Sequence, residues 1–375
     1  MDGLRALAIG GVLLFHLGLP GAMLGWAGVQ LFFVVSGFLI TRILLVSRED
    51  NHPFRSFYIR RALRIFPIYY LYILLMVVIH LGSGVSEPLR FLPLYGTYTQ
   101  NIPSLMDGSA SLLATQHTWS LAVEEQFYWL WPMAVLLLPK NRIRYLIGGL
   151  FLAAPLWRLV IVLSGSHPLL AVGTLPAQID AIAVGGAIAY AQCSGFPAAS
   201  VRRFAWIALW LGTVWVALLS AIVGLSSLWH SRIWVTSPVG FLYLTGIAVL
   251  FGGVVALVVV GIVPRFLTWR PLMQVGRISY GIYLYHALVF FVVRRSSDGI
   301  LEGLGLSADS IAAELVLITM MLTLSYGVAA LSWRLIEQPL LGLKDRLAPT
   351  GSSVTESGGE HPDPSEIVVV PSAVT

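Results

Sequence analysis

Residues 119–131 read WSLAVEEQFYWLW, and the apolar run that begins here continues for seven more residues. A run of this length and composition predicts a transmembrane helix, yet Glu124 and Glu125 lie within it. A carboxylate in the hydrocarbon region costs at least about 2.5 kcal/mol even on the lower insertion scales. A partner inside the protein reduces this cost. We expect that partner to be His16, the only ionisable residue deep in the first apolar segment, and a buried acid–base pair of this kind indicates a functional site.

The composition of the 375-residue chain is that of a multi-pass membrane protein. Hydrophobic residues make up 57% of it and charged residues only 11%, whereas soluble domains contain about 25% charged residues. Apolar segments recur between residues 4 and 341, which excludes a single anchor on a soluble domain. We therefore predict an all-α, multi-pass protein of the cell (plasma or inner) membrane.

Patterns typical of metal and nucleic-acid binding are missing from the sequence. Cys193 is the only cysteine, which excludes an internal disulfide and a cysteine-built metal site. The eight histidines form no His-x-x-x-His or Glu-x-x-His helical pair. We expect no protein-bound metal and no nucleic-acid partner.

Ten apolar segments predict about ten transmembrane helices. Arginines are densest between the second and third segments, and Lys and Arg also gather in the later even-to-odd loops. Because positive residues favour the cytoplasmic side, both termini are predicted to be cytoplasmic. We divide the chain into a transmembrane domain, residues 1–346, and a disordered cytoplasmic tail, residues 347–375, rich in Ser, Gly and Pro. The predicted helices are residues 4–19, 27–46, 66–82, 119–138, 144–163, 170–191, 204–224, 238–262, 272–293 and 311–335.

The segment 53–66 mixes arginines with aromatic and aliphatic side chains, which predicts an amphipathic helix at the cytoplasmic membrane surface. Arg61 and Arg64 are three residues apart and share one face of it, with Arg60 beside them. Paired guanidiniums bind phosphate through two parallel hydrogen bonds, so these arginines are candidates for holding a phosphate-bearing ligand. The simpler interpretation is that they anchor the helix to anionic membrane lipid.

The predicted membrane topology brings His16 and the two glutamates to a similar depth in the membrane. Arg5 lies at the cytoplasmic end of the first helix, and His16 follows about 16 Å further along the same face. Glu124 and Glu125 lie within the first two turns of a helix that runs inward. A carboxylate on one imidazole nitrogen would leave the other free to act as a base. The alternative is a structural histidine beside a buried carboxylate.

Other membrane-buried polar groups are interpreted as structural. Asp180 and Arg158 are expected to pair, and His286 shares a helical face with Ser279. Ser36 and Gly37 are small residues of the kind that let two membrane helices pack closely.

Six motifs together resemble the acyltransferase-3 family of integral membrane acyltransferases, over nearly the whole chain. They are DGLRALA at 2–8 with His16, GVQLFFVVSGFLIT at 28–41, FYIRRALRIFPIY at 57–69, TWSLAVEEQFY at 118–128, ISYGIYLYH at 278–286 and IEQP at 336–339. The resemblance implies ten transmembrane helices. It also implies transfer of an acyl group, usually acetyl from acetyl-CoA, to a hydroxyl of a sugar or another acceptor.

The resemblance also implies roles for particular residues. His16 matches the catalytic histidine, and Arg5 its partner in the Arg-x10-His motif. Arg61 and Arg64 match arginines thought to hold the CoA phosphates. Glu124 or Glu125 matches an essential acid. Gln30 departs from the family, where an aspartate is common at this position.

These observations favour a membrane O-acyltransferase that takes acyl-CoA from the cytoplasm and acts on a glycan or small-molecule hydroxyl at the outer side. Polysaccharide, peptidoglycan, glycolipid and macrolide acceptors all stay open, as does the oligomeric state. The alternative is a proton-coupled transporter or flippase in which the same His and Glu relay protons. A purely structural scaffold would leave Glu124 and Glu125 unexplained.

Overall fold

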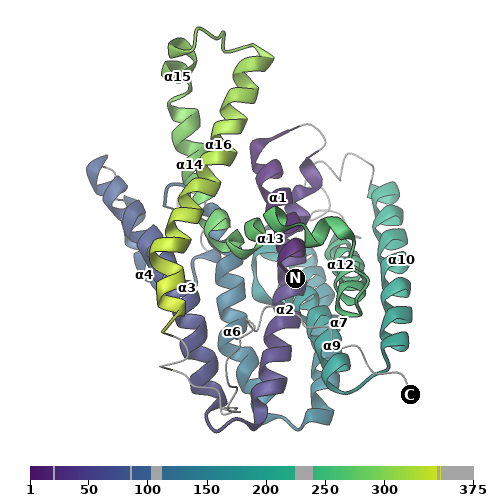
Figure 1. The fold of residues 1–375 in the computed structure, drawn as a ribbon. Coiled ribbons are helices and arrows are strands. Elements are labelled where there is room, and N and C mark those ends of the chain that lie inside the picture. The colour runs from purple at the N-terminus through teal and green to yellow at the C-terminus, as the bar shows by residue number, and fades with distance from the viewer. Residues whose placement is uncertain (20–21, 85–86, 103–111, 224–239, 344–346, 348–375) are drawn as a thin grey trace.

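The computed structural model describes residues 1–19, 22–84, 87–102, 112–223, 240–343 and 347 (Figure 1). Helices, turns and loops make up this part of the chain, without a β-strand. The tail predicted at residues 347–375 lies outside the described residues, except for Leu347. The long helices are α1 (Asp2–Leu17), α2 (Gly28–Val46), α3 (Pro53–Gly82), α6 (Trp119–Leu137), α7 (Lys140–Leu163), α9 (Leu175–Cys193), α10 (Ala198–Val223), α12 (Tyr243–Val259), α14 (Ser279–Arg295) and α16 (Ile311–Ser332).

Each of the ten predicted segments overlaps one of these helices, although the ends differ by several residues in most of them. Among the described residues, six helical stretches are long and apolar enough to cross a membrane by themselves. They are Leu24–Glu49, Pro53–Gly82, Lys140–Leu163, Leu170–Cys193, Ala198–Ile222 and Ile311–Leu341. A seventh candidate is the pair α13 (Arg270–Arg277) and α14, which is bent by 73°. Ten spans and cytoplasmic termini stay predictions, because α1, α12 and α14 have only 16 or 17 residues each.

The basic segment 53–66 is the first half of α3 and not a separate surface helix, so the predicted boundary at Phe66 is wrong. Helix α3 has 30 residues, about 45 Å, and continues through Pro67. Proline removes one backbone hydrogen bond, but the residues after it are held by packing, since Tyr69 and Tyr72 are fully buried. The arginines of the segment are therefore carried along a helix that enters the bundle.

Glycines allow the helices of the bundle to approach closely. Helix α2 packs most extensively against α9, where a Cβ added to Gly37 would lie 2.1 Å from the carbonyl oxygen of Ile182. A Cβ added to Gly185 would lie 2.0 Å from the carbonyl oxygen of Val34. These two backbones are in direct contact, which confirms the packing role predicted for Gly37.

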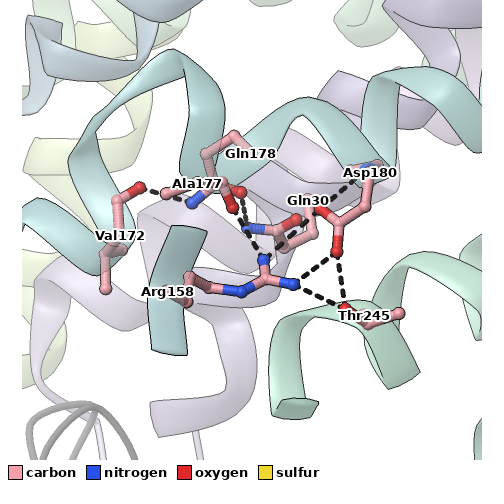
Figure 2. A network of polar contacts seen from close by, with 8 residues as sticks. Gln30, Arg158, Val172, Ala177, Gln178, Asp180 and Thr245 are labelled. Atoms are coloured by element: carbon pink, nitrogen blue, oxygen red, sulfur yellow. Dashed lines mark hydrogen bonds and ion pairs between the residues drawn. The ribbon is translucent and has the colours of Figure 1, made fainter. Parts of the chain in front are cut away.

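A buried polar network joins α2, α7, α9 and α12 (Figure 2). The Arg158 guanidinium donates to Asp180 at 2.6 Å and to Thr245 at 2.5 Å, and Thr245 donates to Asp180 at 2.7 Å. The predicted Arg158–Asp180 pair is confirmed. Beside it, Gln30 donates to Gln178 at 2.6 Å. The residue that departs from the family pattern is thus part of the contact between α2 and α9.

Helices α14 and α16 pack against each other as an antiparallel pair, with α15 (Ser297–Gly303) at their shared end (Figure 1). Helix α1 contacts α2, α13 and α14. Its first turn is fixed against α13, where a Cβ added to Gly276 would lie 1.9 Å from the carbonyl oxygen of Asp2. This packing brings the far end of α1 to the side of α14.

Candidate active site

Three histidines from three different parts of the chain meet in one cluster. His16 lies at the end of α1, His286 in α14, and His117 in the turn η5 (Gln116–Thr118) that leads into α6. The ring of His286 lies between the other two, with its centroid 4.9 Å from each. His286 and His117 are buried, whereas His16 is exposed on the protein surface. The cluster therefore opens at His16 and ends inside the protein.

The backbone of α1 fixes the proton arrangement of the His16 ring. Nδ1 lies 2.9 Å from the carbonyl oxygen of Val12. A carbonyl oxygen only accepts, so Nδ1 is the nitrogen that carries the hydrogen. In the neutral ring, Nε2 then holds the lone pair and is free to accept a proton. The Val12 carbonyl thus orients the His16 ring, a role that the sequence predicted for a glutamate.

The predicted hydrogen bond between His16 and a glutamate is not formed. Glu124 instead accepts hydrogen bonds from the hydroxyls of Ser36 and Tyr128, which are themselves 2.6 Å apart. Glu125 is buried, and its Oε1 has no hydrogen-bond partner. The prediction was wrong because similar depth does not fix rotation: α6 turns Glu124 toward α2 rather than toward α1.

Glu124 nevertheless lies near the histidine cluster, through Tyr283. The Glu124 carboxylate interacts electrostatically with Tyr283. The Tyr283 hydroxyl lies 2.5 Å from the Ser120 hydroxyl and donates to the His117 carbonyl oxygen at 2.9 Å. Tyr283 thus connects the three imidazoles with the polar group around Glu124.

The arginines of α3 reach the other side of this polar group. The Arg61 guanidinium lies over the ring of Tyr128, 4.2 Å from its centroid. The Arg61 guanidinium also interacts electrostatically with the Glu125 carboxyl group, and the Arg64 guanidinium interacts in the same way with the Glu337 carboxyl group. Tyr128 is the middle residue of α6, so Arg61 lies level with the centre of that helix. Its predicted place at the cytoplasmic boundary stays a prediction, because Arg61 is about 12 Å from the start of α3 and this helix is longer than the hydrocarbon core is thick. Arg60 is half-buried on the same helix.

Arg5 is not brought to His16. Both belong to one continuous helix, and eleven residues separate them by about 16 Å. Arg5 pairs instead with Asp2 at 3.1 Å, at the end of α1 that packs against α13. Its side chain therefore pairs within the first turn of α1 and does not contact the imidazoles.

Comparison with known proteins assigns the chain to a family. A family model described as an acyltransferase domain matches residues 1–331. The chain belongs to this acyltransferase family. The membership expected from the motifs is confirmed, and together with the six apolar helices it identifies a multi-pass membrane protein.

Curated relatives of this acyltransferase cover most of its length. It is 27% identical over 367 residues to peptidoglycan O-acetyltransferase OatA of Listeria monocytogenes, which aligns with 91% of this chain and 55% of the relative. It is 30% identical over 309 residues to putative peptidoglycan O-acetyltransferase YrhL of Bacillus subtilis, covering 76% of this chain and 47% of the relative. O-acetyltransferase OatA of Staphylococcus aureus is 25% identical over 362 residues, covering 91% and 56%. The chain spans about half the length of these relatives. No solved structure matches it.

Several residues of the candidate site were not predicted from the sequence. His117 was not singled out, although it stands two residues before the helix that holds Glu124. His286 was interpreted as structural, and Tyr283 and Ser120 were not considered. A signal was available, because a histidine directly before an apolar helix with two glutamates is an uncommon combination. Only the folded chain shows that His286 lies against His16 and that His117, Tyr283 and Ser120 lie behind it.

Proposed function

We propose that this protein transfers an acyl group, with acetyl as the expected one, from acyl-CoA to a hydroxyl of a cell-envelope carbohydrate. Family membership supports acyl transfer. The names of two relatives make a peptidoglycan sugar the first acceptor to test. The observation that carries the proposal is the His16 ring, whose Nδ1 is held by the Val12 carbonyl while Nε2 stays free at an exposed end of the cluster.

His16 would act as the general base. The hydroxyl proton of the acceptor passes to Nε2 while the acceptor oxygen forms a bond to the acyl carbon. The carbon–sulfur bond breaks, and the departing thiolate takes the proton back from the imidazolium. Protons and charge balance without a further reactant. General base catalysis of this kind contributes about 10²- to 10⁴-fold to the rate.

Arg61 and Arg64 would hold the phosphates of the donor. Arg61 Nε is buried and has no hydrogen-bond partner, so the guanidinium has a donor to offer. Glu125 and Glu337 now face these two arginines. A phosphate that binds there would compete with the carboxylates, which keep the guanidiniums in place until it arrives. Arg60 would add positive charge beside them.

Glu124 and Arg5 would then be positioning residues. Glu124, held by Ser36 and Tyr128, fixes the aromatic ring on which Arg61 lies. Arg5 would stabilise the first turn of α1 through Asp2, at the end where α1 packs against α13. In the predicted threading, with ten spans and both termini cytoplasmic, the donor enters from the cytoplasm and the acceptor approaches from outside.

The test uses the purified protein in lipid nanodiscs with acetyl-CoA and a soluble fragment of the peptidoglycan glycan. We expect release of the CoA thiol in step with an acetyl mass increment on the glycan. The His16→Gln variant should release no thiol. If the wild-type protein gives neither thiol release nor an acetylated glycan, the proposal is contradicted. In liposomes, which unlike nanodiscs enclose a compartment, movement of the glycan across the membrane without thiol release would instead indicate a transporter.

A further inference from the structure

Two ring nitrogens in the histidine cluster are buried and have no hydrogen-bond partner. His286 uses Nδ1 to bond the carbonyl oxygen of Tyr283 at 2.7 Å, and its Nε2 is left without a partner. His117 uses Nε2 to bond the carbonyl oxygen of Leu284 at 3.2 Å, and its Nδ1 is left without a partner. Buried polar atoms of proteins are nearly always paired with a protein group, an ordered water or a ligand, so two such atoms in neighbouring rings mark a place where a hydrogen-bond donor binds.

The chemistry of that ligand follows from the bonds that are made. Each ring faces a carbonyl oxygen, which only accepts, so the nitrogen in that bond carries the hydrogen. In the neutral rings, His286 Nε2 and His117 Nδ1 are therefore acceptors that need an O–H or N–H donor. The nearby hydroxyls of Tyr283 and Ser120 are already bonded to each other and to the His117 carbonyl oxygen.

A metal ion is a poor fit to the cluster. Within the described residues, no three His, Cys, Asp or Glu side chains are placed so that they could hold a metal together. A water molecule or a hydroxyl of an organic ligand could supply the donor, and an organic ligand would reach the cluster past His16, the only one of the three rings that is exposed.

We propose that His286 and His117 form a subsite for the hydroxyls next to the one that reacts, so that the acceptor is a polyhydroxy compound such as a sugar. This inference rests on the proposed function and adds the residues that bind the acceptor. One hydroxyl meets His16 Nε2, and its neighbours donate to His286 Nε2 and His117 Nδ1. The centroid of the His286 ring is 4.9 Å from each of the other two, a spacing that the hydroxyls of one sugar unit would span once the unit has entered past His16 and displaced the side chains that now cover the two nitrogens.

Two variants at each position distinguish the loss of the acceptor lone pair from the loss of the volume of the ring. His286→Gln keeps an acceptor oxygen near the position of Nε2, and His117→Asn keeps one near Nδ1, while His286→Leu and His117→Leu keep none. We expect each Leu variant to raise the KM for the glycan fragment about tenfold, the size of one lost hydrogen bond. The KM for acetyl-CoA should stay within about twofold, and the Gln and Asn variants should recover most of the glycan KM.

His80 provides the matched control. It is also a buried histidine, and it bonds Met76 through Nδ1 at 2.9 Å as His16 bonds Val12. Its Nε2 accepts from the Leu113 amide at 3.4 Å, so both ring nitrogens are satisfied. His80→Leu should therefore leave the glycan KM unchanged. An unchanged glycan KM in the His286 and His117 variants, or equal losses in the amide and Leu variants, overturns the subsite.

Binding of the glycan fragment without donor distinguishes this inference from the proposed function. If the wild-type protein binds the fragment, His286→Leu binds it about tenfold more weakly, and no acetyl is transferred, then the subsite stands and the acyltransferase proposal fails. If acetyl is transferred but His286→Leu and wild type bind the fragment equally, the subsite fails alone. No binding to the wild-type protein also overturns the subsite. Where a Leu variant does not fold, His286→Phe or His117→Phe takes its place, because phenylalanine keeps a flat ring without the lone pair; it must bind the fragment about tenfold more weakly than the amide variant does.

Discussion

The guanidinium of Arg61 lies over the ring of Tyr128, 4.2 Å from its centroid, at the middle of α6. The hydroxyl of the same tyrosine is bonded to Glu124 and Ser36. One aromatic side chain therefore stands between the cationic side of the bundle, from α3, and the acidic residues of α6. This arrangement sets expectations for donor binding.

Replacing Arg61 should weaken binding of the acyl donor. Arg61→Ala removes a guanidinium that is charged and has an unused Nε donor, so we expect the KM for acetyl-CoA to rise at least tenfold with a smaller change in the acceptor KM. Arg61→Lys should recover only part of this, because an ammonium lacks the planar fork. Arg55→Ala is the matched control, since Arg55 is an exposed arginine of the same helix. Equal effects at both positions would point to loss of general positive charge instead.

Replacing His16 should remove the chemical step and leave binding intact. We expect His16→Gln to lower kcat by at least about 10²-fold, with little change in the KM for acetyl-CoA, because the amide cannot accept the proton. Steady-state kinetics and single-turnover release of the CoA thiol measure the two effects separately. His80→Gln should keep wild-type kcat. A His16→Gln variant with full turnover would exclude His16 as the base.

Glu124 should affect the donor side more than the proton transfer. Glu124→Gln and Tyr128→Phe each disturb the group on which Arg61 lies, so both should raise the KM for acetyl-CoA by severalfold. If Glu124 instead oriented His16, Glu124→Gln would lower kcat as strongly as His16→Gln does and leave the donor KM unchanged. Side-by-side kinetics of the three variants decide between these roles.

The Arg158–Asp180 pair should act on stability and not on kinetics. Removing one partner leaves a buried charge alone, so we expect Arg158→Leu or Asp180→Leu to lower the free energy of unfolding by about 3–5 kcal/mol. The double variant Arg158→Leu/Asp180→Leu should be more stable than either single one. Thermal unfolding in detergent measures the relative stability of the three variants. The folded fraction of each should keep the wild-type KM values. Additive losses in the double variant would contradict the pairing.

Replacing a glycine where α2 and α9 cross should prevent the two helices from packing together. Gly37→Ala and Gly185→Ala place a Cβ about 2 Å from a backbone oxygen, so each should greatly reduce the yield of folded protein. Gly148→Ala is the control, because its Cβ would meet nothing within 4 Å. Size-exclusion profiles of the three variants give the comparison. A well-folded Gly37→Ala protein would show that the two helices are further apart.

The sequence by itself determined the helices and much of the chemistry. Apolar run length is a local property, so all ten segments could be located without the fold. The pairing of Arg158 with Asp180 was also predictable, since each is a charge in an apolar segment with few possible partners. The motifs were sufficient to indicate the family, because matches in the same order along a chain do not depend on contacts.

Only the tertiary structure decided which groups surround His16. Depth along a helix follows from counting residues, but rotation about its axis depends on packing, and packing turns Glu124 to Ser36 and Tyr128. The rings of His117 and His286 reach His16 from segments far apart in the sequence, and no local pattern indicates that they meet. The continuation of α3 past Pro67 was hidden for the same reason, because burial of Tyr69 and Tyr72 against other helices outweighs the local cost of the proline.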